Sequence, residues 1–315
     1  MASLHMASKP RVKTRGLFSA RFRREIPLYI MMLPTVVLLL VFAYGPMGGI
    51  LMAFQKYLPG LGIMRSKWVG LANFRYLIDY PGILSVLWNT VFIAVMKILV
   101  GLVAPVTVAL LLNELQSKFV KRTVQTLIYL PYFLSWVILS GILVDILSPS
   151  KGIVNQALGL LGVPPIYFLG DKTVFPYTMV FSDLWKNFGF GTIVYLAALT
   201  GIDPTLYEAS IVDGAGRWKQ TIHVTLPGIL PIVVLMTVLS LGNILNAGFE
   251  QIFNLYSIQV YDTGDIIDTL VYRMGMLNYQ YGVATAMGLF KSLVSAGLIV
   301  LSYWLADRVA RYRIF

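Results

Sequence analysis

The chain has 315 residues, of which 57% are hydrophobic and only 12% are charged, and its formal net charge is +11. This charged share is about half that of a soluble domain, and apolar runs of ~20 residues recur, so we predict an all-α polytopic membrane protein. The alternating strands of an outer-membrane barrel are absent from the sequence. With no cysteine and only two histidines, His5 and His223, it excludes a disulfide framework, a thiol nucleophile and a histidine-based metal site.

The basic residues gather at the two ends of the chain. Seven precede the first apolar run and three end the sequence: Lys9, Arg11, Lys13, Arg15, Arg21, Arg23, Arg24, Arg308, Arg311 and Arg313. Basic ends beside apolar spans follow the positive-inside rule and argue against nucleic-acid binding. We therefore predict cytoplasmic segments at 1–25 and 308–315 around a transmembrane domain at 26–307. The first eight residues, with Leu4-His5-Met6, can belong to an expression tag.

The first apolar run, 26–54, is too long and too strongly anchored for a signal peptide. Pro34 and Pro46 lie inside it and are expected to bend or break it. A mixed loop at 55–82, with a tryptophan and several tyrosines suited to a membrane–water interface, leads to the second span.

Five further spans complete a prediction of about six transmembrane helices. We expect them at 83–112, 126–147, 175–200, 224–247 and 283–305. A short basic loop at 116–125 precedes the third span, and a longer exposed loop at 249–282 precedes the sixth.

Six spans place both termini on one side of the membrane. The segments expected inside hold fifteen lysines and arginines, and the loops expected outside hold seven. This difference predicts an N-in/C-in orientation. The polar segment 201–223, between the fourth and fifth spans, is then cytoplasmic.

Within this polar segment, Asp203-Pro204 predicts a helix start, because aspartate caps well and proline suits the first helical position. Gly214 and Gly216 allow a sharp exit or a close approach of another backbone. The spacing leaves two interpretations open. The segment is either a short helix that docks into a cytosolic partner or an amphipathic loop on lipid headgroups.

The segment also resembles a known motif. The motif reads E-A-A, three residues, G, nine residues and then I-x-L-P. The matching residues in this chain are Glu208-Ala209-Ser210, Gly214 and Val224-Thr225-Leu226-Pro227. This pattern is the EAA loop of permease subunits in binding-protein-dependent ABC importers. Ser210 replaces the second alanine and Val224 replaces isoleucine, and both keep the size class.

The resemblance extends over nearly the whole chain, to the maltose-type oligosaccharide permeases and, within them, to a permease subunit of an alginate importer. It implies a type I ABC importer permease fold in the bacterial cytoplasmic (inner) membrane. It also implies three kinds of partner: a second permease subunit in a heterodimer, two ATPase subunits, and a periplasmic or extracellular solute-binding protein. The coupling helix would contact the ATPase through residues carried over from the motif: Glu208, Ala209, Ser210, Asp213, Gly214, Leu226 and Pro227.

No G-x-x-x-x-G-K-[ST] phosphate loop occurs in the sequence. We therefore expect a non-catalytic subunit without a cofactor, with ATP and Mg on the partner ATPase.

Three lysines, Lys97, Lys186 and Lys291, lie near the middle of predicted spans. A lysine facing lipid at the bilayer centre costs about 2.5–3.5 kcal/mol, so they are expected to face protein or water. Asp183 lies three residues before Lys186 and is expected to pair with it. Two interpretations stay open for these lysines: contacts with backbone carbonyls or snorkelling, and a path for an anionic sugar such as a uronate oligosaccharide.

A polar stripe of four residues, Asn243, Asn246, Glu250 and Gln251, is predicted at the outer end of the fifth span. The first three follow helical spacing and should share one face. The stripe would contact either sugar hydroxyls or the second permease. The candidate residues of a substrate pathway are Lys186, Asn187, Lys291, Asn243, Asn246 and Glu250.

Two other classes of protein were weighed. An ion-coupled secondary sugar transporter, the main alternative, predicts acidic residues at mid-membrane, whereas the mid-span charges here are mainly lysines. A membrane enzyme needs a convergent acid/base or metal cluster. The acidic cluster in the sequence is Asp262, Asp265 and Asp268, which we interpret as a solvated outer loop.

Overall fold

The computed structural model describes the backbone of residues 15–310 and the side chains of residues 25–304. The basic ends used to predict orientation therefore lie largely outside the described side chains. Over the described residues the chain is almost entirely helical, with one antiparallel pair of short strands, β1 (Gln55–Lys56) and β2 (Lys67–Trp68). The chain divides into two compact units, Met1–Leu51 and Met52–Phe315.

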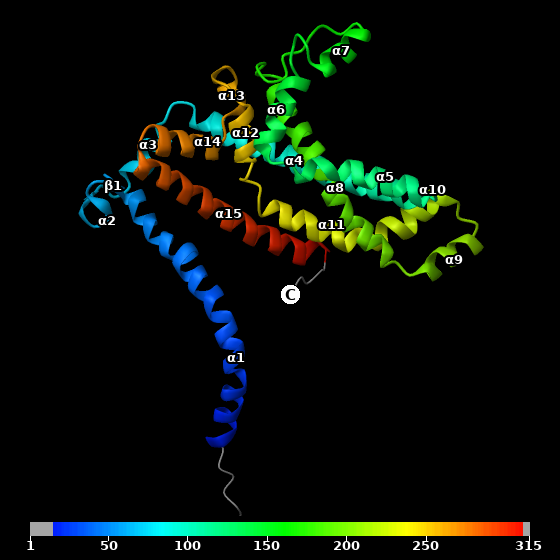
Figure 1. The fold of residues 1–315 in the computed structure, drawn as a ribbon, viewed down its shortest axis with the longest axis horizontal. Helices are drawn as coiled ribbons and strands as arrows, with labels where there is room; N and C mark the ends of the chain where they lie inside the picture. The colour runs from blue at the N-terminus through cyan, green and yellow to red at the C-terminus, as the bar shows by residue number, and fades with distance from the viewer. Residues whose placement is uncertain (1–14, 311–315) are drawn as a thin grey trace, which may run out of the picture. The chain divides into compact units, whose positions relative to one another are not determined.

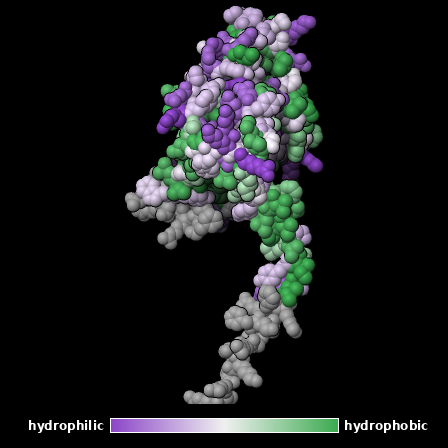
Figure 2. Space-filling view, turned by 90° about the vertical axis from the view of Figure 1, so that its left-hand side faces the viewer, coloured by the Kyte–Doolittle hydropathy of each residue, from purple (hydrophilic) through white to green (hydrophobic). Residues whose placement is uncertain are grey.

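The described part of the first unit is helical, and it is apolar from residue 26 onward. Helix α1 (Arg15–Leu39) runs through Pro34, and a π-helical turn (Leu40–Tyr44) and a 3-10 helix (Gly45–Phe54), which crosses the unit boundary, follow it. The regular helix therefore ends before Pro46, whose ring carries no N–H to donate to the preceding turn. Apolar side chains of α1 are exposed, as Figure 2 shows for this segment.

In the second unit, two pairs of long helices pack lengthwise (Figure 1). Helix α4 (Ile83–Glu114) lies along α8 (Phe175–Thr200), and α11 (Leu226–Leu241) lies along α15 (Tyr281–Ala310). Lipid is as apolar as a leucine side chain, so such helices associate through close packing. Helix α8 also packs closely against the helix that carries Ile128. At Gly189 of α8 an added Cβ would lie 2.1 Å from the Ile128 carbonyl oxygen, so the close approach of these two helices needs glycine.

Among the residues that the structure describes, four helices are long and apolar enough to cross a membrane by length and composition, or five segments if one bent pair is a single span. The four are Glu25–Phe54, Ile83–Glu114, Arg217–Leu241 and Tyr281–Trp304. Helix α8, at the position of the fourth predicted span, is not among them, because polar side chains lower its hydropathy. The count of six and the N-in/C-in orientation stay predictions.

The third predicted span is wrong in its boundaries. Helix α5 (Lys118–Tyr129) begins inside the expected basic loop, because the Ser117 side chain caps it by accepting from the amide of Val120. After a 3-10 turn at Leu130–Phe133, α6 (Trp136–Ile146) leaves at a bend of 108°. Proline and a second serine cap start new helices here and stop one straight span from forming.

The end of the fifth predicted span is also wrong. Helix α11 stops at Leu241, and a turn with Gly248 at a φ of +94° leads into α12 (Phe249–Leu255). Asn243 and Asn246 lie in this irregular connection and Glu250 lies in α12. The three residues therefore do not share one helical face.

The expected outer loops contain short helices. The segment predicted as a loop before the last span holds α12, a 3-10 turn (Ile258–Val260), α13 (Tyr261–Gly264), α14 (Ile267–Tyr272) and a π-helical turn (Arg273–Leu277). Elsewhere the short helices are α2 (Gly62–Arg65), α3 (Ala72–Ile78) and α7 (Ile153–Leu160). Viewed from the end with β1, α2 and α3, hydrophilic side chains gather across the middle of this unit (Figure 2).

Candidate functional site

Helix α9 (Pro204–Val212) fills the polar segment between α8 and α11, at the end of the second unit opposite β1, α2 and α3 (Figure 1). It starts as the sequence predicts: the Asp203 side chain accepts a hydrogen bond from the Thr205 amide at 2.9 Å. This bond to the backbone, followed by bonding to the Thr205 side chain, lowers the pKa of Asp203. The cap satisfies an amide that the first helical turn leaves without a partner.

The helix ends in a Schellman motif. The Ala215 amide donates to the Ser210 carbonyl at 2.9 Å and the Gly214 amide donates to the Ile211 carbonyl at 3.0 Å. Gly214 adopts a φ of +74°, which side chains rarely tolerate. An added Cβ at Gly214 would meet nothing within 4 Å, so here the glycine serves the turn and not a close approach within the chain.

A hydrogen bond attaches one side of α9 to the rest of the chain. It joins the Tyr207 hydroxyl to the Thr225 hydroxyl at 3.0 Å. Within α9 itself, the Ser210 hydroxyl donates to the Tyr207 carbonyl at 2.7 Å. After α9, the chain forms α10 (Arg217–Gln220) and a π-helical turn (Thr221–Thr225), and α11 then begins at Leu226 with Pro227 in its first turn. The loop is therefore tied directly to the base of a long helix.

The other side of α9 is exposed and mostly apolar. The side chains that face away from the chain are Leu206, Glu208, Ala209, Ile211, Val212 and, from α10, Trp218. The Glu208 carboxylate has no hydrogen-bond or ion-pair partner among the residues that the structure describes. An exposed carboxylate within an apolar surface suits contact with another protein.

A second polar feature lies at the break between α11 and α12. A cavity of about 270 Å³ is lined by side chains from α4, α8 and the connection after α11. Asn243 and Asn246 line it together with Lys97 and Asp183. Lys186, Asn187, Lys291 and Glu250 do not line this cavity, so the structure does not bring the six predicted pathway residues together.

The predicted pairing of Asp183 with Lys186 is wrong. Asp183 lies 3.4 Å from the ammonium of Lys97, on the neighbouring helix α4. Lys186 is 8% exposed and donates to the carbonyls of Pro131, Tyr132 and Leu134, at the bend between α5 and α6. The Pro131 carbonyl also accepts from the Leu134 amide in the 3-10 turn, and the buried ammonium adds a donor to carbonyls at a bend where the regular helical bonding stops.

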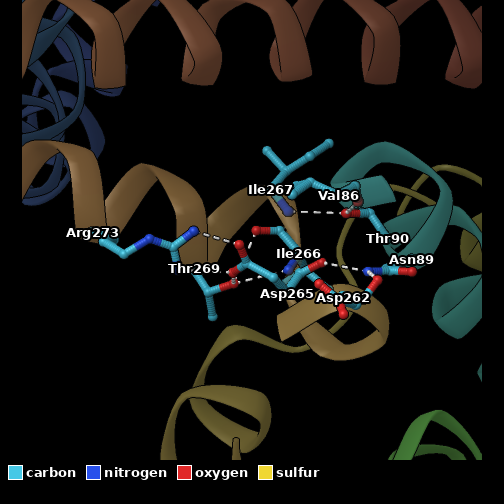
Figure 3. Close-up of polar contacts among 9 residues, drawn as sticks. All are labelled: Val86, Asn89, Thr90, Asp262, Asp265, Ile266, Ile267, Thr269 and Arg273. Atoms are coloured by element: carbon cyan, nitrogen blue, oxygen red, sulfur yellow. Dashed lines mark hydrogen bonds and ion pairs between the residues drawn. The ribbon is translucent and has the colours of Figure 1, made fainter. Parts of the chain in front are cut away.

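The interpretation of the outer aspartates as solvated is wrong for two of them. Asp265 is 3% exposed, and its carboxylate accepts hydrogen bonds from Arg273 and from the Thr269 hydroxyl, as Figure 3 shows. Asp268 pairs with Lys291 at 2.6 Å. Asp262 alone is exposed, where it pairs with Lys172.

Hydrogen bonds of backbone groups between Asp262 and Ile267 also join this segment to helix α4. The Asn89 amide donates to the carbonyls of Asp262 and Asp265, and the Ile267 amide donates to the Thr90 hydroxyl (Figure 3). The aspartates therefore belong to a structural network. No signal in the sequence distinguishes it from a loop, because the partners are more than 170 residues apart.

Sequence reasoning also missed Gln251 as an interior residue. Its side chain is fully buried and donates to the Met179 carbonyl and to the Ser182 hydroxyl, both at 2.8 Å. The available signal for its burial was a glutamine among apolar residues. Because Gln251 follows the predicted fifth span, the sequence assigned it to the outer polar stripe instead.

Comparison with known proteins extends these observations. Residues 101–313 match the family described as binding-protein-dependent transport system inner membrane component. The chain is 38% identical over 288 residues to the polygalacturonan/rhamnogalacturonan transport system permease protein YteP of Bacillus subtilis (strain 168), covering 91% of this chain and 90% of that protein.

Two solved structures have the same fold. The first, of a bacterial ABC transporter involved in the import of the acidic polysaccharide alginate, aligns with a TM-score of 0.85 at 38% identity, covering 93% of this chain and 99% of that chain. The second, of a bacterial alginate ABC transporter in complex with an alginate pentasaccharide-bound periplasmic protein, aligns with a TM-score of 0.85 at 37% identity, covering 94% and 99%.

Fold and relatives together define a multi-pass helical permease subunit of an ABC transporter. The chain belongs to the family of binding-protein-dependent transport system inner membrane components.

Proposed function

We propose that the chain is a transmembrane subunit of an ATP-driven importer that moves oligosaccharides across the bacterial cytoplasmic membrane. The observation that carries the proposal is α9: a short capped helix, bonded to the base of α11 on one side and exposed on the other. The segment 201–223 is then the coupling loop of a transmembrane domain at 26–307. Glu208, Ala209, Ser210, Asp213 and Gly214 form or shape the docking helix, and Leu226 and Pro227 begin the helix that moves with it.

The partner at α9 is a separate ATPase subunit, which binds ATP and Mg. Closure of two such subunits on ATP would displace α9, and the Tyr207–Thr225 contact would pass this displacement to α11. The chain itself contributes no catalysis. Its exposed apolar residues bury against the ATPase, and the Glu208 carboxylate pairs there with a cation or an amide donor.

The substrate path runs between this chain and a second permease subunit, in a heterodimer. Asn243, Asn246 and Glu250 are exposed polar residues at the α11–α12 break, where sugar hydroxyls can replace water as hydrogen-bond partners. Asn187 on α8 and Lys291 on α15 are candidates at other levels of this path. Lys186 is buried and bound to three carbonyls, so it would border the path without contacting the sugar. A solute-binding protein delivers the saccharide from the outside.

The relatives support an oligosaccharide as the substrate, and the two alginate transporters support an acidic one. This part is tested by uptake of acidic and neutral oligosaccharides of equal length into vesicles with the assembled transporter. Uptake of acidic oligosaccharides alone supports the proposed acidic class.

Glu208→Lys tests the coupling role. Reversing the charge at a docking surface costs several kcal/mol, so we expect oligosaccharide uptake and uptake-coupled ATP hydrolysis to fall at least about a hundredfold. The variant should still insert into the membrane, because Glu208 is exposed and has no hydrogen-bond or ion-pair partner among the described residues. Uptake into vesicles and ATP hydrolysis stimulated by the loaded binding protein are the measurements.

The matched control is Asp79→Lys, an equal charge change at an exposed residue after α3, at the opposite end of the unit. This variant should transport normally. Normal coupled transport by Glu208→Lys would contradict the proposal.

A further inference from the structure

Lys97 makes contacts that its position in the sequence does not predict. Its side chain is 10% exposed and lies between three elements. The ammonium donates to the Ala247 carbonyl at 2.7 Å and to the Gln251 side-chain carbonyl, and it lies 3.4 Å from the Asp183 carboxylate. An ammonium has three protons: two are donated to these carbonyl oxygens, and the third side of the group faces Asp183 as an ion pair.

The contacts attach the irregular connection after α11 to the rest of the second unit. The chain is not helical at Ala247, so the carbonyl there lacks a partner one turn later and Lys97 supplies one. The Gln251 side chain adds a second attachment, because it accepts from Lys97 while donating to α8 at Met179 and Ser182. An irregular backbone at membrane depth is stable only when buried groups satisfy it in this way.

The same connection carries Asn243 and Asn246, which line the cavity beside Lys97 and Asp183. Because the protons of Lys97 are all engaged, its ammonium cannot bind a sugar carboxylate without releasing the carbonyl of Ala247, the amide of Gln251 or Asp183. Its contacts are suited to holding the wall of the cavity in place and not to contacting the cargo.

We propose that Lys97, held by Asp183, is a positioning residue that attaches the α11–α12 connection to α4 and α8 and so places Asn243 and Asn246 in the saccharide path. The proposal rests on the proposed transport function. The alternative is that Lys97 only neutralises the charge of Asp183. In that case, removing both charges together should leave transport unchanged.

The double variant Lys97→Met/Asp183→Asn therefore separates the two roles. It leaves no unpaired charge in the interior but removes the donor to Ala247 and Gln251. The transporter assembled with its partner subunits should accumulate normally and keep its ATP hydrolysis, while oligosaccharide uptake falls at least about tenfold, because a displacement near 1 Å is enough for such a loss.

A second measurement reports the position of the connection without using transport. The chain has no cysteine, so Ala247→Cys places one thiol at a fully buried position of the connection. A water-soluble maleimide should label it about fivefold faster in the double variant, the factor expected from loss of one hydrogen bond. Gly248→Ala provides an independent route, because its Cβ would lie 2.9 Å from the Lys97 ammonium at a φ of +94°. It should raise the labelling rate while keeping both charges.

The matched control is Lys172→Met/Asp262→Asn, which removes an exposed ion pair of the same chemistry. It should change neither uptake nor labelling. Normal uptake by the Lys97→Met/Asp183→Asn variant overturns the proposal, and so does an unchanged labelling rate. If the wild-type complex transports no saccharide but labelling responds as expected, the proposed function fails and the attachment by Lys97 stands.

Discussion

The charged side chains inside this protein mostly neutralise one another or satisfy backbone carbonyls. Lys186 donates to three carbonyls at the α5–α6 bend, and Lys291 pairs with Asp268. Asp265 is the most buried carboxylate of those described, and Arg273 and Thr269 satisfy it. Burial of a charge is costly unless it is paired and hydrogen-bonded, so each of these pairs fixes the relative position of two elements.

Arg273→Met should therefore destabilise the protein strongly. The change leaves the Asp265 carboxylate buried without its cation, which costs about 3 kcal/mol or more. The thermal midpoint of the purified transporter should fall, and the double variant Arg273→Met/Asp265→Asn should recover most of the loss. A single variant as stable as the wild type would contradict the assignment of this pair to the structure.

At the scale of elements, the chain departs from simple spans where proline, serine and glycine interrupt apolar runs. Ser117 and Ser135 start α5 and α6, and Gly248 ends the connection after α11. Each interruption frees backbone groups, and buried side chains of α4 and α8 satisfy them. Helix α8 therefore acts as the support of both breaks, through Lys186 at one and Asp183 at the other.

Gly189→Ala tests the packing of α8 on α5. The added Cβ would lie 2.1 Å from the Ile128 carbonyl oxygen, so the two helices must separate. Overpacking of this kind typically costs about 1–3 kcal/mol, and we expect a lower yield of folded protein and a lower thermal midpoint. The control is Gly288→Ala in α15, where an added Cβ would meet nothing within 4 Å and stability should be kept. Equal stability of both variants would show that the α5–α8 contact yields easily.

At the scale of the molecule, function depends on which side of the membrane each end of the second unit faces. The exposed helix α9 lies at one end of the second unit. Helix α7 follows the upper end of α6, away from the α5–α6 bend (Figure 1). Charge counts predict that α9 is cytoplasmic and α7 is outside. With this orientation the proposed ATPase would reach α9, and the other side would remain for the proposed solute-binding protein.

Single cysteines test this orientation in a chain that has none. Val212→Cys on α9 and Leu160→Cys on α7 replace side chains that are 87% and 89% exposed. A membrane-impermeant maleimide should label Leu160→Cys in intact spheroplasts and Val212→Cys only in inverted vesicles. The reverse pattern would place α9 outside and remove its proposed partner.

The sequence by itself determined the class of protein and the position of the short helix α9 between two long helices. Apolar runs and few charges require a helical membrane protein, and the caps at Asp203 and Gly214 are local features, so α9 was predicted correctly. Local serine, proline and glycine residues mark where the spans break, but tertiary structure alone decided which buried groups satisfy the breaks and which charges pair. The partners of Lys97, Lys186 and Asp265 lie on other elements, and helical spacing reports only neighbours on the same helix.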